Sequence, residues 1–100
     1  MNGTAPVADD GDTFAPGDAG AQAARCYELI EDALKKLDLD RTAIVRCTMY
    51  VTDISRQDEF GLAHKEFFGG HRPCLTMIGV KELVSDDMLV EIECDAVAAE

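Results

Sequence analysis

Two residues in the last third of the chain have the types and settings that acid–base chemistry on a small carboxylate requires. Arg72 and Pro73 precede an apolar run that predicts a buried strand over residues 74–80, so Arg72 lies at the entrance of that strand. Glu91 lies within residues 88–97, whose alternation predicts the final strand. A guanidinium binds a carboxylate through two parallel hydrogen bonds, and a partly desolvated carboxyl group can exchange a proton near neutral pH. Together, Arg72 and Glu91 predict an anion-anchored acid–base site.

The same residues also fit a purely structural role. In the final predicted strand one face is apolar and the other is largely acidic, with Val90, Ile92, Cys94 and Ala96 opposite Leu89, Glu91, Glu93 and Asp95. A row of carboxylates on a strand is often only a solvated face, and an arginine at a strand end is often only an ion-pair partner. Spacing alone favours this structural role by about two to one.

Hydrophobic periodicity predicts the elements that hold these residues. They are a loop over residues 1–17, a helix over 18–37, a strand over 43–52, a helix over 55–68, and strands over 74–80 and 88–97. Asp18 caps the first helix, while Ser55 and Asp58 resemble a capping box before the second, which Gly69 ends. The order predicts a single α+β domain over residues 1–100, with two helices on one face of a sheet.

Several side chains receive packing roles in this arrangement. The apolar stripe of the first helix is expected to contain Ala23, Cys26, Ile30, Ala33 and Leu37. Tyr27 is expected to be half-buried, and His64 to be a helix-surface or packing residue and not a ligand. Arg46 would neutralise the carboxylates of the last strand if the two strands are neighbours. His71, beside Arg72, is a weaker candidate for touching a substrate.

The composition disfavours several classes of function. Twenty acidic residues against nine basic residues give a net charge of -11, a field that repels phosphate backbones and anionic lipids. We therefore expect no nucleic-acid or membrane partner. Without a long apolar run or the features of a signal peptide, a soluble cytoplasmic protein is expected. The four cysteines form no C-x-x-C pair and only two histidines are present, so reduced thiols and no metal site are expected.

Several ordered motifs carry a resemblance to a known family. They are Gly17-Asp18-Ala19-Gly20-Ala21-Gln22, Arg46-Cys47-Thr48-Met49-Tyr50-Val51-Thr52-Asp53-Ile54, Phe67-Phe68-Gly69, Arg72-Pro73-Cys74 and Val90-Glu91-Ile92-Glu93-Cys94-Asp95-Ala96. In this order, over about residues 3–97, the sequence resembles the reactive intermediate deaminase (Rid, YjgF-like) family. The resemblance implies a chorismate-mutase-like fold and a homotrimer with a site between each pair of subunits. It also implies cofactor-free hydrolysis of 2-imino acids or enamines, of the 2-iminobutanoate or 2-iminopropanoate type, to 2-oxo acids and ammonia.

The resemblance also assigns the residues of the site. Arg72 would bind the substrate carboxylate, and Glu91 would orient or activate the attacking water. Cys74 would line the pocket, and the backbone amide of Gly3 would donate to the substrate carboxylate. An alternative of another class is a trimer of the same family that binds small carboxylates without turnover. Ribonuclease activity, attached to some relatives, is disfavoured by the net charge.

The N-terminus departs from the family pattern. Residues 2–4 resemble the end of the family's second strand, so most of the preceding hairpin is missing, and a misplaced start, a fragment or a shortened member would each account for this. An upstream tyrosine of the family has no counterpart, with Tyr50 or Phe68 as candidates to replace it.

If the last two strands formed a direct hairpin, Arg72 would lie roughly 15 Å from Glu91. The family fold instead places the last strand between the N-terminal strand, of which residues 2–4 remain, and the strand over residues 43–52. It also lets a neighbouring subunit complete the pocket. The edge left by the missing strand would need cover from upstream residues or trimer contacts.

Overall fold

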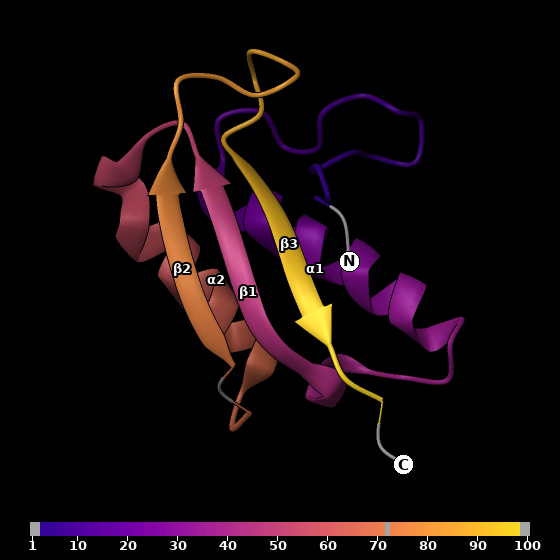
Figure 1. Cartoon of the computed structure of the whole chain (residues 1–100). Coiled ribbons are helices and arrows are strands. Elements are labelled where there is room, and N and C mark those ends of the chain that lie inside the picture. The colour runs from indigo at the N-terminus through magenta and orange to yellow at the C-terminus, as the bar shows by residue number, and fades with distance from the viewer. Residues whose placement is uncertain (1–2, 72, 99–100) are drawn as a thin grey trace.

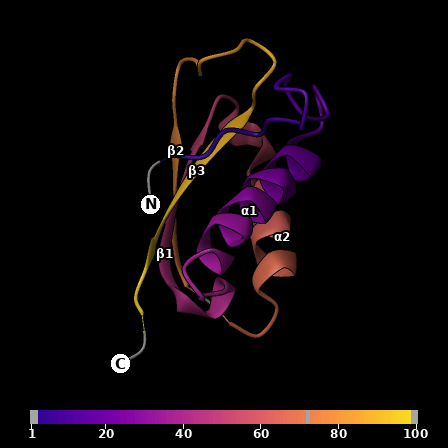
Figure 2. The same cartoon turned by 90° about the vertical axis from the view of Figure 1, so that its right-hand side faces the viewer.

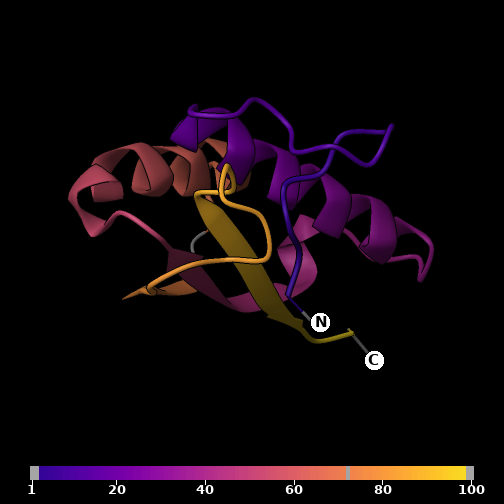
Figure 3. The same ribbon diagram turned by 90° about the horizontal axis from the view of Figure 1, so that it is seen from above.

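The computed structural model describes residues 3–71 and 73–98, which form a helix layer packed on a sheet. In chain order the elements are α1 (Ala19–Lys35), η1 (Arg41–Ala43), β1 (Ile44–Val51), η2 (Ile54–Arg56), α2 (Gln57–Phe68), β2 (Cys74–Gly79) and β3 (Val90–Ala96), where η marks a short 3-10 helix. Both long helices lie against the same face of the sheet (Figure 1, Figure 2), and the view from above shows the same two layers (Figure 3). The predicted α+β architecture is confirmed.

The sheet places its last strand next to its first one. The strand order is β2-β1-β3, in which β1 pairs parallel with β2 and antiparallel with β3. On the outer side of β3, the N–H of Thr4 donates to the carbonyl of Ile92 at 2.6 Å, and the N–H of Ile92 donates back at 3.0 Å. The N-terminal segment therefore lies beside β3 at the edge opposite β2 (Figure 1). Thus β3 lies between β1 and the N-terminal segment that contains Thr4, which is the order that the family resemblance implies.

Helix α1 begins at the predicted cap and ends earlier than predicted. Asp18 accepts a hydrogen bond from the N–H of Ala21 at 3.0 Å, which satisfies one of the free donors of the first turn. Leu34 is buried, whereas Leu37, placed by periodicity on the apolar face, is 70% exposed. The chain leaves the helix before Leu37 and turns at Asp38 with a φ of 60°. Leu37 therefore cannot continue the buried stripe.

The side chains of strand β1 alternate between the two faces of the sheet over most of its length. Cys47, Met49 and Val51 are buried against the helices. Ile44 is also buried, although the alternation placed it on the same face as Arg46. The pairing of β1 with β3 shifts register between Ile44 and Arg46, and an irregularity of this kind changes the face on which the preceding side chain lies.

The side-chain cap before α2 belongs to the short helix η2 and is not at the predicted residue. The carboxylate of Asp53 accepts from the N–H and the hydroxyl of Ser55, at 3.0 and 2.5 Å, and begins the short helix η2. The N-cap position of α2 itself has no side-chain cap, so the predicted box between Ser55 and Asp58 is wrong. The carboxylate that accepts from the N–H of Ser55 is that of Asp53, which precedes Ser55, and not that of Asp58, which follows it. Gly69 ends α2 as predicted, with a φ of 59° and its N–H donating to the carbonyl of Lys65.

Strand β2 is an exposed edge, so the predicted buried strand is wrong. Leu75 and Met77 are half-buried against the core, whereas Cys74, Thr76 and Ile78 are exposed on the other face. Because β3 occupies the other side of β1, β2 has a strand neighbour on one side only among residues 3–71 and 73–98. An apolar run does not reveal how many neighbours its strand has, and that number decides its burial.

The core between the layers is built around an aromatic cluster. Tyr27, expected to be half-buried, is fully buried and stacks on Phe67 with ring centroids 4.6 Å apart. Its hydroxyl lies 2.5 Å from Nδ1 of His64, and Phe68 contacts it edge-on. The packing role predicted for His64 is confirmed. The rest of the core comprises Ala19, Ala23, Cys26, Ile30, Leu34, Ile44, Cys47, Met49, Val51, Phe60, Ala63, Val90, Ile92 and Cys94.

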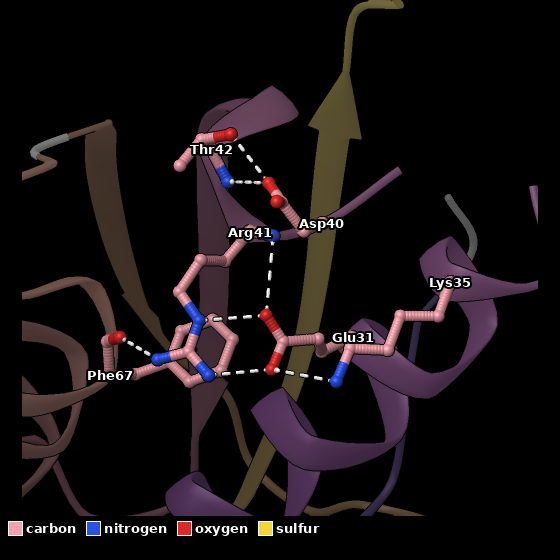
Figure 4. A network of polar contacts seen from close by, with 6 residues as sticks. All are labelled: Glu31, Lys35, Asp40, Arg41, Thr42 and Phe67. Carbon is pink, nitrogen blue, oxygen red and sulfur yellow. Dashed lines mark hydrogen bonds and ion pairs between the residues drawn. The ribbon is translucent and has the colours of Figure 1, made fainter. Parts of the chain in front are cut away.

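The connection from α1 to β1 is held by Arg41 (Figure 4). Its Nε donates to one oxygen of Glu31 at 2.7 Å and its Nη2 to the other at 2.5 Å, while Nη1 donates to the carbonyl of Phe67. The guanidinium also lies 4.1 Å from the centroid of the Phe67 ring. Beside it, Asp40 accepts from the N–H and hydroxyl of Thr42 and starts η1. One arginine therefore joins α1, the α1–β1 connection and the end of α2.

Gln22 joins α1 to the segment that leads into β3. Its side chain is fully buried, and its Nε2 donates to the carbonyls of Ala15 and Asp87 at 3.3 and 2.9 Å. Its Oε1 accepts from the N–H of Leu89 at 2.7 Å. All three partners are backbone groups outside regular hydrogen-bonded elements, and a buried backbone group without a partner costs about 1–3 kcal/mol.

We expect Gln22→Leu, which keeps the side-chain volume, to lower the free energy of unfolding by about 1–2 kcal/mol because these backbone groups lose their partners. Urea denaturation followed by circular dichroism measures the change. Gln57→Leu, at an exposed position at the start of α2, is the matched control and is expected to change stability by less than about 0.5 kcal/mol. Equal stability of the two variants would contradict the role given to Gln22.

Candidate active site

The face of the sheet that carries no helix holds Glu91 and Cys74. The strand register places side chains on this face in rows across β2, β1 and β3. The rows are Cys74, Arg46 and Asp95, then Thr76, Thr48 and Glu93, then Ile78, Tyr50 and Glu91. Backbone alternation produces this arrangement, because the neighbouring positions turn inward to the helices. The acidic side of β3 therefore belongs to an accessible face, as predicted.

Two of the three carboxylates on β3 have partners within the chain. The Tyr50 hydroxyl donates to Glu93 at 2.7 Å, and this bond raises the pKa of Tyr50 because the ionised phenol could not donate it. Arg46 donates to Asp95 from Nε at 2.9 Å and from Nη2 at 2.5 Å. The neutralising role predicted for Arg46 is confirmed, and Glu93 and Asp95 are structurally engaged.

Glu91 differs from the other two carboxylates. It is half-buried, and within the described residues its carboxylate forms no ion pair or side-chain hydrogen bond. It lies directly against the backbone of Gly3, since a Cβ built on Gly3 would be 2.9 Å from Oε2 of Glu91. Only a residue without a side chain allows this approach without displacing the carboxylate. The bridge between Thr4 and Ile92 fixes the segment that brings Gly3 there.

The remaining candidates lie elsewhere. Arg72 is outside the described residues, so its predicted position is not compared. Cys74 is exposed at the start of β2 and is paired with Arg46 of β1. Glu91 is on β3, two strands away from Cys74, and is paired with Tyr50, four residues further along β1. Four residues along the strand and two strand spacings separate Cys74 from Glu91 by about 16 Å. One chain thus brings Gly3 and Glu91 together and leaves Cys74 apart from them.

Other polar groups have structural roles in the described chain. His71, the weaker candidate for substrate contact, donates from Nε2 to the carbonyl of Ile44 at 2.7 Å and so ties the start of β2 to β1. The described residues contain no group of three or more metal-binding side chains. None of the described helices is both long enough and apolar enough to cross a bilayer.

Of the two candidates to replace the family's upstream tyrosine, Phe68 is buried in the core, whereas Tyr50 is paired directly with Glu91, a pairing that sequence reasoning did not identify. Their Cα atoms are paired in the β1–β3 ladder, so the phenol lies beside both Glu91 and its own partner Glu93. The available signal was the shared phase of Arg46 and Tyr50 along β1, together with the antiparallel partner strand. Tyr50 is therefore the aromatic residue placed at this end of the uncovered face.

Comparison with known proteins defines the family. The family Ribonuc_L-PSP, described as Endoribonuclease L-PSP, matches residues 1–98. The chain belongs to this family. Because solved structures of YjgF and its relatives share the same fold, both the predicted membership and the chorismate-mutase-like fold are confirmed.

Individual family members match the chain at moderate identity. Rv2704 from Mycobacterium tuberculosis is a member of the YjgF/YER057c/UK114 family and is 37% identical to this chain. The matched region covers 98% of this chain and 76% of Rv2704, with a TM-score of 0.85. TdcF from E. coli, solved with bound serine, is 26% identical, with 99% and 79% coverage and a TM-score of 0.88. Protein DfrA from Myxococcus xanthus is 30% identical over 82 residues, which is 82% of this chain. The chain spans 60% of the length of DfrA.

Proposed function

We propose that this protein hydrolyses reactive 2-imino acids or their enamine tautomers, of the 2-iminobutanoate type, to 2-oxo acids and ammonia without a cofactor. The observation that carries the proposal is the contact between the Gly3 backbone and Glu91, a carboxylate without a partner in the described chain. A backbone amide and a carboxylate side by side can hold an anionic substrate and act on the atom next to its carboxyl group. Family membership supports a hydrolase or deaminase role.

Each residue of the site then has a chemical role. Arg72 pairs with the substrate carboxylate, and the Gly3 amide donates to the same group. Glu91 takes a proton from a water molecule as the water oxygen adds to the C=N carbon of the protonated imine, which gives a neutral carbinolamine. Glu91 then returns this proton to the nitrogen. As the C–N bond breaks and ammonia leaves, the carboxylate takes the hydroxyl proton and the C=O bond of the 2-oxo acid forms. Cys74 lines the pocket and forms no covalent bond with the substrate.

The site requires more than one chain. Gly3 and Glu91 lie at one edge of the sheet and Cys74 at the other, about 16 Å from Glu91. A cyclic assembly brings one edge of each copy to the opposite edge of the next. We infer a homotrimer in which the start of β2 from one subunit completes the pocket at Glu91 of another. The same contact would cover the exposed edge of β2.

Turnover of an unstable imine tests the proposal. We expect the wild-type protein to accelerate the decay of 2-iminobutanoate generated in the assay by an amino-acid oxidase. Arg72→Ala is expected to lower the acceleration about 100-fold, because the substrate carboxylate loses its bidentate partner. Semicarbazide trapping of the remaining imine follows the decay. Equal rates for wild type, Arg72→Ala and buffer would contradict the proposal.

A second candidate function is the binding of a small carboxylate without turnover. The bound serine of TdcF favours this candidate, because an amino acid offers the same carboxylate as an imino acid. Binding without any acceleration of imine decay would support it. A net charge of -11 opposes RNA binding and so disfavours, for this chain, the endoribonuclease activity that the family description mentions.

A further inference from the structure

Two buried cysteines face each other across the β1–β3 ladder. Cys47 and Cys94 are directly paired in the antiparallel register, and their sulfur atoms are 3.1 Å apart. Both lie on the helix-facing side of the sheet, where Cys47 is fully buried and Cys94 is 2% exposed. Both are thiols in this structure. The pair lies on the opposite face from Glu91, so the proposed function makes no use of it.

The backbone geometry at this pair suits a disulfide. Directly opposed residues of an antiparallel ladder have Cα atoms about 4.5 or 5.5 Å apart, and both values fall within the range of about 4.4–6.8 Å found in disulfides. The sulfur atoms must approach by about 1 Å to reach a bond of about 2.05 Å. Rotation of the two side chains can supply this movement without separating the strands. The other two cysteines differ, since Cys26 lies on α1 and Cys74 is exposed on the other face of the sheet.

The surroundings distinguish the two sulfur atoms chemically. The hydrogen bond from Cys94 lowers the pKa of Cys47 below its ordinary value, and the nearby His64 and Tyr27 act in the same direction. The same hydrogen bond and burial raise the pKa of Cys94. Burial raises the pKa of Cys26 to about 12, so that thiol keeps its proton. Because the two sulfur atoms share one hydrogen bond and His64 and Tyr27 also act on Cys47, we assign the thiolate of the pair to Cys47 and the proton to Cys94.

A hollow at the surface borders one neighbour of this pair. The hollow, of about 280 Å³, is lined by His64, Phe68, His71 and four further residues at the end of α2 and the start of β2. His64 also contacts the Tyr27 hydroxyl, and both side chains influence Cys47. His64 therefore borders both a hollow large enough for hydrogen peroxide and the surroundings of Cys47.

We propose that Cys47 and Cys94 are a redox-sensitive pair that a hydroperoxide converts into a disulfide joining β1 to β3. In the first step, the Cys47 thiolate attacks the peroxide, the O–O bond breaks, and a sulfenic acid and one hydroxide form. In the second step, the sulfur of Cys94 attacks Cys47 as its proton leaves, the S–S bond forms, and the sulfenic oxygen leaves as hydroxide. Overall, two thiols and one peroxide give one disulfide and two waters.

Peptide mapping can identify this disulfide without any variant. Trypsin places the four cysteines in four separate peptides, residues 26–35, 47–56, 66–81 and 82–100. The folded protein is treated with hydrogen peroxide, its free thiols are blocked with N-ethylmaleimide under denaturing acid conditions, and the digest is analysed by mass spectrometry. We expect peptide 47–56 linked to peptide 82–100, with a mass two hydrogen atoms below the sum of the two reduced peptides, and reversal by dithiothreitol.

Oxidation of the exposed Cys74 in the same sample shows that the peroxide treatment was effective. The double variant C26A/C74A, which keeps the pair, is expected to form the same link, and adding Cys47→Ala is expected to abolish it. If Cys74 is oxidised while Cys47 and Cys94 are both recovered as unoxidised thiols, or if the link joins other cysteines, the proposal is wrong. None of these readouts depends on imine turnover, so this test and the test of the proposed function succeed or fail independently.

Discussion

Glu91→Gln is expected to abolish imine turnover while sparing the binding of small carboxylates. The amide keeps the shape of the side chain beside Gly3 but cannot take a proton from water. Loss of a general base typically costs about 10²–10⁴ in rate, so we expect a fall in kcat of this size. Affinity for the product 2-oxobutanoate is expected to change by less than about threefold, because Arg72 and the Gly3 amide still hold its carboxylate. Stopped imine assays and titration calorimetry measure the two quantities.

Glu93→Gln is the matched control for this variant. Glu93 lies on the same face of β3, two residues away, but it accepts a hydrogen bond from Tyr50. We expect its replacement to reduce kcat by less than about tenfold, because the residue supports the site and does not act on the substrate. If the two variants lost activity equally, the distinct role of Glu91 would be contradicted.

Arg41→Ala is expected to lower the free energy of unfolding by about 2–3 kcal/mol at pH 7. The substitution removes both bonds to Glu31, the bond to the Phe67 carbonyl and the packing on the Phe67 ring (Figure 4). The Glu31 side chain is only 12% exposed, so water replaces the lost guanidinium poorly. Lys35→Ala is the control, because its Nζ lies 4.0 Å from the same carboxylate and is well exposed, and we expect a change below about 0.5 kcal/mol.

The pH dependence of this variant has a definite sign. The hydrogen bond from Arg41 lowers the pKa of Glu31 in the folded protein below its ordinary value of 4.5. The pair therefore stabilises the fold above about pH 4.5 and loses this effect as the pH falls through the lowered pKa. The stability difference between wild type and Arg41→Ala should narrow between pH 7 and pH 3. A difference that stays constant or widens would show that Glu31 is not the partner that matters.

The sequence predicts well those features that depend on the environment of one strand or helix. The alternation of Val90, Ile92 and Cys94 with the acidic residues of β3 holds because one face of that strand meets helices and the other does not. The cap at Asp18 depends only on its own helix and was also predicted. Shared phase along β1 was sufficient to foresee that Arg46 would neutralise a carboxylate of β3.

Features that depend on distant neighbours could not be predicted from spacing. The exposure of β2 follows from the position of β3, which only the family resemblance supplied. The contact of Tyr27 with His64 joins two helices and depends on how they rotate against each other. The approach of Gly3 to Glu91 needs a bridge across 88 residues of chain, from Thr4 to Ile92. Arg72 lies outside the described residues, and its role stays a prediction of the resemblance.

Mixing two inactive chains tests the intersubunit site most directly. Co-expressed Arg72→Ala and Glu91→Gln chains, carrying different affinity tags, are purified through both tags in turn and assayed for imine decay. In a mixed trimer, some sites combine the intact Arg72 of one chain with the intact Glu91 of the next, whereas each variant alone has no intact site. Because every trimer that carries both tags has one such site among its three, we predict recovery of about a third of the wild-type activity. A mixed assembly no more active than either variant alone would contradict a site shared between subunits.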